Sequence, residues 1–264
     1  MTIDLSQPIA YGRTAEIYPW QEGQILKLFH DWFELENIEH EARIAQAIHA
    51  SGLPVPAVGD ILRVNGRNGL VYQRMDGDTI WEALPRRPWR IIHYARRMAE
   101  LHVEMHTITL QADLPSQRQR LVGKIRHAEA LPIHLRAKAL TALEVMPDGD
   151  RLCHGDFHPG NILVTVQGEM VIDWIDASVG NPLADLARTS ILALGAAETR
   201  QTRGSLLKAF LRLFHAAYLR YYFKLRPGGE DEYRLWLPVV AAARLSEKIP
   251  EVEQWLIAMT EKGL

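Results

Sequence analysis

The pattern of hydrophobic and polar positions divides the chain into a strand-rich first part and a helical second part. Short apolar runs on both sides of Gly12 predict two strands joined by a turn, and Gln24–Phe29 predicts a third strand. From residue 31 to residue 51 the apolar positions recur with a helical period, and Gly52 follows as a helix stop. We therefore expect a small sheet accompanied by one helix.

A hairpin and a connector end this first part. Residues 60–64 and 69–73 predict the two strands of the hairpin. The polar, glycine-containing stretch 75–78 then predicts a connector between two lobes. We place the first lobe at residues 1–76 and the second at residues 77–264.

The second part is mainly helical, with one interruption. Helical periodicity covers residues 88–106, and a shorter helix is expected after Pro132. Strand-like runs around a turn at Gly168 interrupt the helices within residues 152–175. Helices resume where Asn181, a good N-cap residue, precedes a proline. A later helix is expected to bury a stripe of apolar side chains: Leu206, Phe210, Phe214, Ala217 and Tyr221.

Composition excludes several classes of protein. The 264 residues carry a net charge of −2, whereas nucleic-acid-binding proteins normally have a basic excess. With 47% hydrophobic residues the chain can build a core, which excludes intrinsic disorder. The sequence shows no secretory signal and no apolar run long enough to span a membrane, so we expect a cytoplasmic protein. Cys153, the single cysteine, is expected to be a buried, inert thiol.

The densest polar cluster runs from His154 to Asn161. The spacing between Asp156 and Asn161 equals the spacing between the catalytic base and the metal-binding asparagine in the H-R-D-x-x-x-x-N loop of protein kinases. Asp173 follows across an expected hairpin, where a second metal-binding carboxylate is needed. A carboxylate must accept the proton of an attacking hydroxyl, and hard oxygen ligands must hold Mg²⁺ on the phosphates. An Asx-rich turn, or a zinc-binding pair formed by His154 and His158, is the alternative interpretation.

The first part supplies residues suited to binding a nucleotide. Lys27 stands where the strand lysine of V-A-I-K contacts the α- and β-phosphates. Glu41, on the following helix, is expected to pair with Lys27 and fix its position. Gly12 begins a short loop whose backbone N–H groups would cover the phosphates. A plain turn explains Gly12 equally well, because the chain contains no G-x-G-x-x-G pattern.

These motifs resemble the aminoglycoside phosphotransferase and choline kinase group of kinase-like enzymes. The similarity runs from about Gly12 to Ala187 and is most specific in H-G-D-x-H-x-x-N, beginning at His154, and in the later I-D-W. The resemblance implies an α+β, two-lobed protein-kinase-like fold with a small antiparallel-sheet N-lobe containing one helix and a larger, mainly helical C-lobe. It also implies ATP-dependent transfer of a phosphoryl group to a hydroxyl of a small molecule, such as an aminoglycoside or an amino-alcohol.

The resemblance implies a role for each matching residue. Asp156 would be the catalytic base, and Asp185 would brace the catalytic loop through hydrogen bonds. Oxygen ligands for Mg²⁺ would come from Asn161 and Asp173. The remaining matches form the phosphate anchor, the phosphate-covering loop and the lobe connector that receives the adenine: Lys27, Glu41, Gly12, Gln73 and Met75.

The sequence leaves the acceptor and the class of function open. Tyrosine and tryptophan side chains near the C-terminus could form an aromatic box for a quaternary ammonium group, but their helical spacing favours a packed core. From Gly195 onwards eleven basic residues outnumber eight acidic ones, which weakens the prediction of a polycationic acceptor, although the acidic run 230–232 keeps it open. A nucleotide-binding regulatory module without turnover is an alternative function. A protein kinase is disfavoured by the short segment after Asp173.

Overall fold

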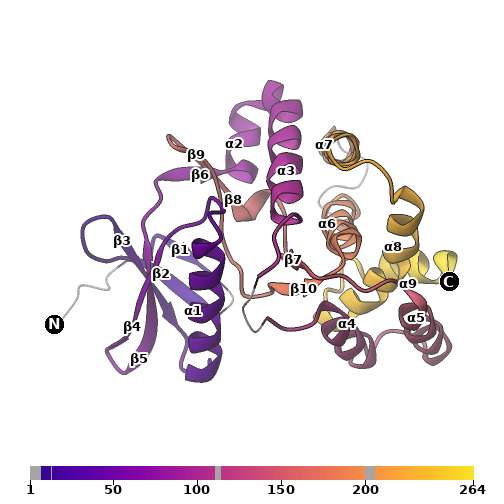
Figure 1. The fold of residues 1–264 in the computed structure, drawn as a ribbon, viewed down its shortest axis with the longest axis horizontal. Coiled ribbons are helices and arrows are strands. Elements are labelled where there is room, and N and C mark those ends of the chain that lie inside the picture. The colour runs from indigo at the N-terminus through magenta and orange to yellow at the C-terminus, as the bar shows by residue number, and fades with distance from the viewer. Residues whose placement is uncertain (1–6, 13, 111–113, 200–205) are drawn as a thin grey trace.

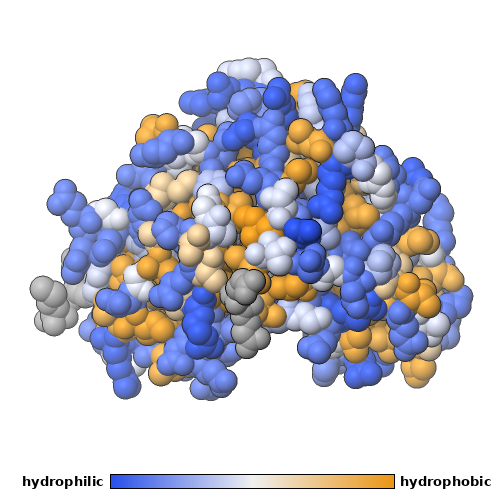
Figure 2. Space-filling view, viewed as in Figure 1, coloured by the Kyte–Doolittle hydropathy of each residue, from blue (hydrophilic) through white to orange (hydrophobic). Residues whose placement is uncertain are grey.

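The computed structural model describes residues 7–12, 14–110, 114–199 and 206–264. An antiparallel sheet lies at one end of the molecule and a group of helices at the other (Figure 1). The expected combination of a small sheet with a mainly helical remainder is therefore confirmed. Polar and charged side chains cover most of the face in Figure 2, and the outline is notched between the two ends.

Five antiparallel strands form the sheet in the order β1-β2-β3-β5-β4. Their bounds are β1 (Ala10–Tyr11), β2 (Ala15–Pro19), β3 (Gln24–Phe29), β4 (Val58–Val64) and β5 (Arg67–Gln73). The turn between β4 and β5 is shorter than expected, because Asn65 and Gly66 both adopt the positive φ of a two-residue hairpin turn. This lets the pairing continue up to Val64 and Arg67.

One helix, α1 (Leu35–Ala50), packs its apolar face against this sheet. Ile38 and Ile48 are buried as the helical period predicts, and Glu41 is buried on the same face. The helix begins at Leu35 rather than at residue 31, because the preceding residues form a turn in which the N–H of Phe33 donates to the carbonyl of His30. Gly52, with φ of +85°, follows the helix as expected.

Eight helices of the described residues follow β5. They are α2 (Ile80–Arg86), α3 (Ile91–Met105), α4 (Gln117–Arg126), α5 (Ile133–Val145), α6 (Pro182–Ala196), α7 (Leu206–Leu225), α8 (Glu230–Arg244) and α9 (Glu253–Gly263). Three short 3₁₀ helices accompany them: η1 (Pro88–Arg90), η2 (Pro159–Asn161) and η3 (Leu245–Glu247). The sequence did not predict α2, which is short and contains Pro85, or α4, which is mostly polar.

Two expectations about these helices can be compared with the structure: the N-cap of α6 and the buried face of α7. Asn181 caps α6 as predicted, because its side-chain oxygen accepts the N–H of Leu183. The stripe predicted for α7 is wrong in part: Leu206 is 91% exposed, whereas Phe214 and Ala217 are buried. The buried face of α7 is rotated toward α3 and centres on tyrosines at helical spacing, Tyr218 and Tyr222.

The interruption of the helices consists of short strands. β7 (Arg151–Cys153) pairs with β10 (Ser178–Gly180), and β8 (Ile162–Thr165) forms a hairpin with β9 (Gly168–Val171). The expected connector is shorter than predicted, because β6 (Gly77–Thr79) already pairs with β8. A Cβ atom at Gly77 would lie 2.3 Å from the carbonyl oxygen of Val164, so only glycine fits there. The division at residue 76 stays a prediction.

The largest hydrophobic core among the described residues joins both ends of the molecule. It combines Ile44 and Ile48 of α1 with residues of every helix from α2 to α9. Two smaller hydrophobic clusters pack on the sheet: one includes Phe29 of β3, and the other includes Leu26 and Leu28 of the same strand. In the described part of the chain, no helix has both the length and the apolarity needed to cross a bilayer.

Candidate active site

The loop between β7 and β8 contains the polar cluster, and the β8–β9 hairpin places it beside Asp173. The N–H of Ile172 donates to the carbonyl of Asn161 at 3.0 Å, which continues the pairing of the hairpin. Asp173 follows Ile172 directly, so its backbone lies next to Asn161. The predicted hairpin thus brings together residues that are twelve positions apart.

Asp156 is held between a cation and two further donors. Arg188 of α6 lies 3.4 Å from Oδ1, while Nδ2 of Asn161 and Nε2 of His158 each lie 3.4 Å from Oδ2. Burial on its own raises the pKa of Asp156, but the hydrogen bond from His158 and the charge of Arg188 outweigh burial and hold this pKa below its usual value. Asp156 is therefore an ionised carboxylate that can accept a proton.

Asn161 and Asp173 present the oxygen atoms that a magnesium ion prefers. The Nδ2 atom of Asn161 donates to the carbonyl of Asp156 at 3.0 Å, which leaves the amide oxygen free to coordinate a cation. The side chain of Asp173 is 47% exposed, and its Oδ1 lies 3.8 Å from Nζ of Lys27. An amide oxygen and an accessible carboxylate beside the lysine that is expected to bind phosphate fit Mg²⁺, which is usually bound by one or two side chains and by phosphate oxygens.

The predicted pair of Lys27 and Glu41 is present in the structure. Nζ of Lys27 lies 2.7 Å from Oε1 of Glu41, and the hydroxyl of Tyr72 donates to the same oxygen at 2.8 Å. Burial and the neighbouring Glu41 carboxylate raise the pKa of Tyr72 well above its usual value, so the hydroxyl keeps its proton and donates. The other oxygen of Glu41 is buried without a hydrogen-bond partner among the described residues. Lys27 thus links α1 to Asp173.

Asp185, on α6, holds the loop between β7 and β8, the expected catalytic loop, through hydrogen bonds. Its Oδ1 accepts the N–H of Gly155 and its Oδ2 accepts the N–H of His154, each at 2.8 Å. Nε2 of His102 and Nε2 of His106 lie 3.0 Å and 3.3 Å from Oδ2. All these groups are buried or nearly so, and the hydrogen bonds hold the pKa of Asp185 well below its usual value despite burial. The hydrogen-bonding role expected of Asp185 is present in the structure.

The sequence did not identify the two histidines of α3 as part of this network. Burial lowers the pKa of His102 to about 4, so its ring is neutral and has one proton. A carboxylate only accepts, so this proton lies on Nε2 and is donated to Asp185, while Nδ1 accepts from the hydroxyl of Tyr218. His106 and Tyr222 repeat the arrangement, with a distance of 2.7 Å. His102, His106 and Asp185 are close enough to hold a metal ion, but neutral rings arranged this way have no free lone pair for one.

Two of the proposed nucleotide-binding residues lie at the end of β5. The N–H of Gln73 donates to the carbonyl of Ala57 at 2.8 Å, so it is already engaged. Met75 makes no backbone–backbone hydrogen bond within the described residues, so of the two it fits the expected contact with the adenine edge better. Gly12 lies in the turn between β1 and β2 and donates to the carbonyl of Ala15 at 2.8 Å. Its neighbour Arg13, which belongs to the expected phosphate-covering loop, lies outside the described residues.

Other residues considered for chemistry have structural roles. Cys153 is buried as expected, and burial raises the pKa of its thiol well above the usual value, which agrees with an inert thiol. His154 and His158 both accept backbone N–H groups within their own loop, from Asp156 and Gly160, so they do not form a zinc pair. The C-terminal aromatic side chains that are buried in the helical core confirm packing instead of an aromatic box: Tyr218, Tyr222, Tyr233 and Trp236.

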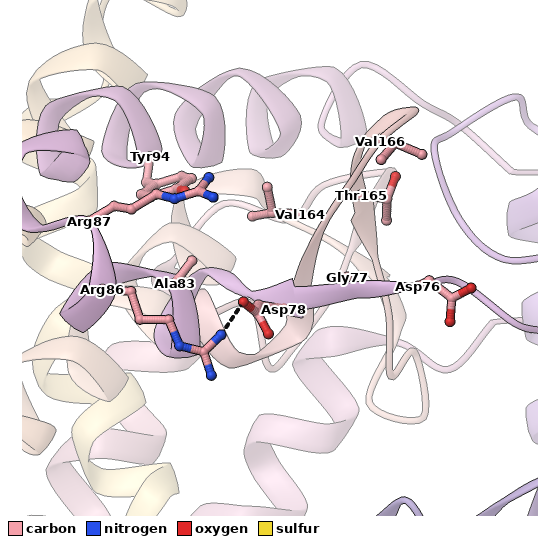
Figure 3. Close-up of a pocket in the computed structure, with 10 residues that line it drawn as sticks. All are labelled: Asp76, Gly77, Asp78, Ala83, Arg86, Arg87, Tyr94, Val164, Thr165 and Val166. Atoms are coloured by element: carbon pink, nitrogen blue, oxygen red, sulfur yellow. Dashed lines mark hydrogen bonds and ion pairs between the residues drawn. The ribbon is translucent and has the colours of Figure 1, made fainter.

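A recess of about 570 Å³ lies apart from these residues, between β6, α2, α3 and the β8–β9 hairpin (Figure 3). An ion pair between Arg86 and Asp78 crosses one side of it, and Arg87 and Tyr94 also line it. None of the residues predicted for catalysis, metal binding or nucleotide binding lines this recess. Its size therefore does not make it the active site.

The fold and the family comparison together identify a kinase-like phosphotransferase. The sequence matches the model of the phosphotransferase enzyme family over residues 20–236, and the chain belongs to that family. The family prediction and the expected class of enzyme are therefore confirmed. No curated protein shows a significant match to the sequence.

Solved structures with the same fold are distant in sequence. The chain is similar to aminoglycoside-3'-phosphotransferase of type VIII, with a TM-score of 0.63, 19% identity and 92% of each chain covered. It is also similar to an amicoumacin kinase in complex with AMP-PNP, with a TM-score of 0.67, 14% identity, and 97% of this chain and 86% of that chain covered. For macrolide 2'-phosphotransferase from Brachybacterium faecium the TM-score is 0.54 at 17% identity, over 96% and 91% of the chains. The protein-kinase-like fold is confirmed.

Proposed function

We propose that the protein transfers the γ-phosphoryl group of ATP to a hydroxyl group of a small molecule, with Asp156 as the base. One observation carries this proposal: a continuous set of contacts joins the required groups. Asn161 touches Asp156 and pairs through its backbone with Ile172, which precedes Asp173. Asp173 in turn lies 3.8 Å from Lys27, and Lys27 is paired with Glu41. The small-molecule kinases among its structural neighbours support an acceptor of that size.

The roles of the side chains follow from their charges. Lys27, oriented by Glu41, donates to oxygen atoms of the α- and β-phosphates. Asn161 and Asp173 are the residues that would hold Mg²⁺, which neutralises phosphate charge when it is bound. Asp156 orients the acceptor hydroxyl and accepts its proton while the acceptor oxygen bonds to the γ-phosphorus and the bond to the bridging oxygen of ADP breaks. Most of the rate enhancement then comes from positioning and charge.

The test measures ADP release from Mg·ATP with a panel of acceptors: sugars, amino-alcohols, aminoglycosides, macrolides, hydroxy acids and a generic protein substrate. With the active acceptor, Asp156→Asn is expected to lower kcat by about 100-fold or more. The asparagine keeps the shape of the side chain, so the Kd of Mg·ATP should stay nearly the same. Turnover at the level of the unchanged protein would contradict the assignment of the base.

The same panel separates the alternatives. Tight binding of Mg·ATP without ADP release for any acceptor would indicate a regulatory module. Stimulation by the protein substrate alone would indicate a protein kinase, which the structure disfavours because only β10 and a short loop separate Asp173 from α6. The cytoplasmic location stays a prediction from the sequence.

A further inference from the structure

A second, much smaller recess lies beside the catalytic loop. It has a volume of about 50 Å³ and opens between α4, α6 and α8. Gly155 of the loop and Arg188 of α6 contribute to its lining, and Arg188 also contacts Asp156 at 3.4 Å. The recess therefore adjoins the carboxylate that we propose as the base. On this measure of volume one water molecule needs about 10–15 Å³, so the space suits a substituent of a few heavy atoms better than a sugar ring.

Both positive and negative side chains line this recess, and the charged ones are Arg120, Lys124, Arg188, Asp176 and Asp185. Arg120 and Lys124 of α4 line it together with Arg188. Glu247 serves three cations at once: it lies 2.7 Å from Arg188, 3.7 Å from Lys124 and 3.6 Å from Arg244. Asp185 already accepts the N–H groups of His154 and Gly155, and Asp176 contacts Arg120 at 3.4 Å. Lys124 is thus a lining cation whose nearest carboxylate among the described residues, that of Glu247, lies 3.7 Å away.

The two cations of α4 have the weakest contacts of the group. Arg120 has five N–H donors, but its contacts among the described residues are long: 3.4 Å to Asp176 and 3.5 Å to the carbonyl of Ile175. Lys124 reaches Glu247 only at 3.7 Å. Burial and the nearby charge of Arg188 lower the pKa of Lys124, which agrees with an incomplete set of counter-charges.

We infer that the acceptor carries an oxyanion, a carboxylate or a phosphate, which Arg120 and Lys124 bind in this recess while the acceptor hydroxyl lies at Asp156. This inference rests on the proposed phosphoryl transfer and names the class of its substrate. A polycationic acceptor would meet like charges here. The acidic run 230–232 does not line the recess, and the carboxylate of Glu232 is already used by Asn181 and Trp236.

The first experiment measures oxyanion binding without requiring the full acceptor. Inorganic phosphate, and separately acetate, is titrated by calorimetry into protein saturated with Mg·AMP-PNP, so that the nucleotide site is filled. We expect saturable binding that weakens by about 10-fold or more in the double variant R120Q/K124Q, because charge-assisted hydrogen bonds are lost. The matched control is Arg126→Gln, which removes a positive charge from the exposed side of the same helix and should bind phosphate as before.

The test compares the phosphate affinity of the unchanged protein with the affinities of its variants. Equal phosphate affinity in the unchanged protein and in R120Q/K124Q, or no saturable binding by the unchanged protein, overturns the inference. If the double variant fails to bind Mg·AMP-PNP, which would indicate a folding defect, the single variant Lys124→Gln replaces it. Preference between phosphate and acetate tells which oxyanion the recess suits.

A second experiment separates this inference from the proposed function. ADP release is measured with acceptors matched except in charge: glycerol, glycerate, glycerol 3-phosphate and ethanolamine, followed by larger sugars, sugar acids and amino sugars. Both the inference and the proposed function are supported if ADP release is greatest with the anionic acceptor of a set and if Lys124→Gln raises the KM for that acceptor about 10-fold. Release only with neutral or cationic acceptors overturns the anionic class and keeps phosphoryl transfer. Oxyanion binding that depends on Arg120 and Lys124, without release for any acceptor, overturns phosphoryl transfer and keeps the recess as an oxyanion site.

Discussion

The catalytic loop and the phosphate anchor are held in different ways. Beneath the loop, Asp185 accepts four hydrogen bonds from groups that are buried or nearly so, and the histidines among them are held in turn by tyrosine hydroxyls. At the anchor, one oxygen of Glu41 accepts two hydrogen bonds and the other has no partner within the described chain. Asp173 is half exposed and touches Lys27 only at 3.8 Å.

The difference indicates that the fold alone positions the loop between β7 and β8, whereas the groups around Lys27 are completed only when a ligand binds. The buried network fixes the loop that carries Asp156 before any substrate binds; for the base that we propose, this is electrostatic preorganisation, which lowers a reaction barrier. Around Lys27 fewer groups are engaged, and we propose that a nucleotide and its metal ion would engage Lys27 and Asp173. We therefore expect changes beneath the loop to affect folding and changes at the anchor to affect nucleotide affinity.

The largest effect is expected for Asp185→Asn. The asparagine amide places its own N–H groups where a carboxylate oxygen accepted hydrogen bonds. Buried donors of the loop and of the α3 histidines therefore lose their acceptor. We expect the free energy of unfolding to fall by about 4 kcal/mol. Urea denaturation measures it, with Asp231→Asn as the control because that side chain is 95% exposed and should change stability little. A loss below 1 kcal/mol for Asp185→Asn would show that the network does not hold the loop.

Acid should weaken the same buried region. Burial lowers the pKa of both His102 and His215 to about 4, below the value of 6.5 in an unfolded chain. The unfolded chain therefore binds more protons below pH 6.5, and stability that is present above pH 6.5 is lost as the pH falls toward 4. Each histidine should account for about 3 kcal/mol of this loss.

The variant His215→Leu tests this pH dependence. Its ring is buried, and Nε2 has no partner among the described residues. Removing it should lower the slope of unfolding free energy against pH by about one proton between pH 6.5 and 4. Urea denaturation across that range measures the slope. An unchanged slope would mean that His215 titrates in the folded protein as it does in the unfolded chain.

At the anchor, Lys27→Met is expected to weaken Mg·ATP binding by about 10-fold, since a charge-assisted hydrogen bond to the phosphates is lost. Isothermal titration measures the Kd, and Lys262→Met, an exposed change on α9, serves as the control. An unaltered Kd in Lys27→Met would remove this lysine from the nucleotide site. Together with Asp156→Asn, which should keep nucleotide affinity, the variant separates binding from chemistry.

The smallest effect is expected for Tyr72→Phe. This change removes one of two hydrogen bonds to Glu41 and leaves its pair with Lys27 in place. We expect the Kd of Mg·ATP to rise about threefold. A rise as large as that of Lys27→Met would show that Tyr72, and not the pair with Glu41, sets the position of the lysine.

The parts of the site that could be predicted from sequence depend on short-range patterns. Asp156 and Asn161 belong to one loop, and Asp173 is brought to them by a hairpin that strand-like runs and Gly168 predict. Lys27 and Glu41 come from adjacent elements, and the helical period already places Glu41 on the buried face of α1.

The parts that escaped prediction depend on contacts between distant segments. His102 reaches Asp185 across 83 positions, and Arg188 reaches Asp156 across 32. Nothing in the local pattern of α3 distinguishes a histidine that supports the loop from one that only fills the core. The small recess has the same origin, because α4 has too few apolar residues to be predicted as a helix, and its cations meet those of α6 only in the folded chain.

One residue of the anchor is also a residue that the backbone disfavours. Asp173 has a φ of +63°, in the left-handed region where a glycine would lie without strain, and a side chain there costs about 1 kcal/mol. A search for stabilising substitutions would select glycine at this position, and it would thereby remove the carboxylate. A substitution at Asp173 that raises thermostability is therefore expected to lower activity. A variant engineered for a higher melting temperature should be checked first at this residue.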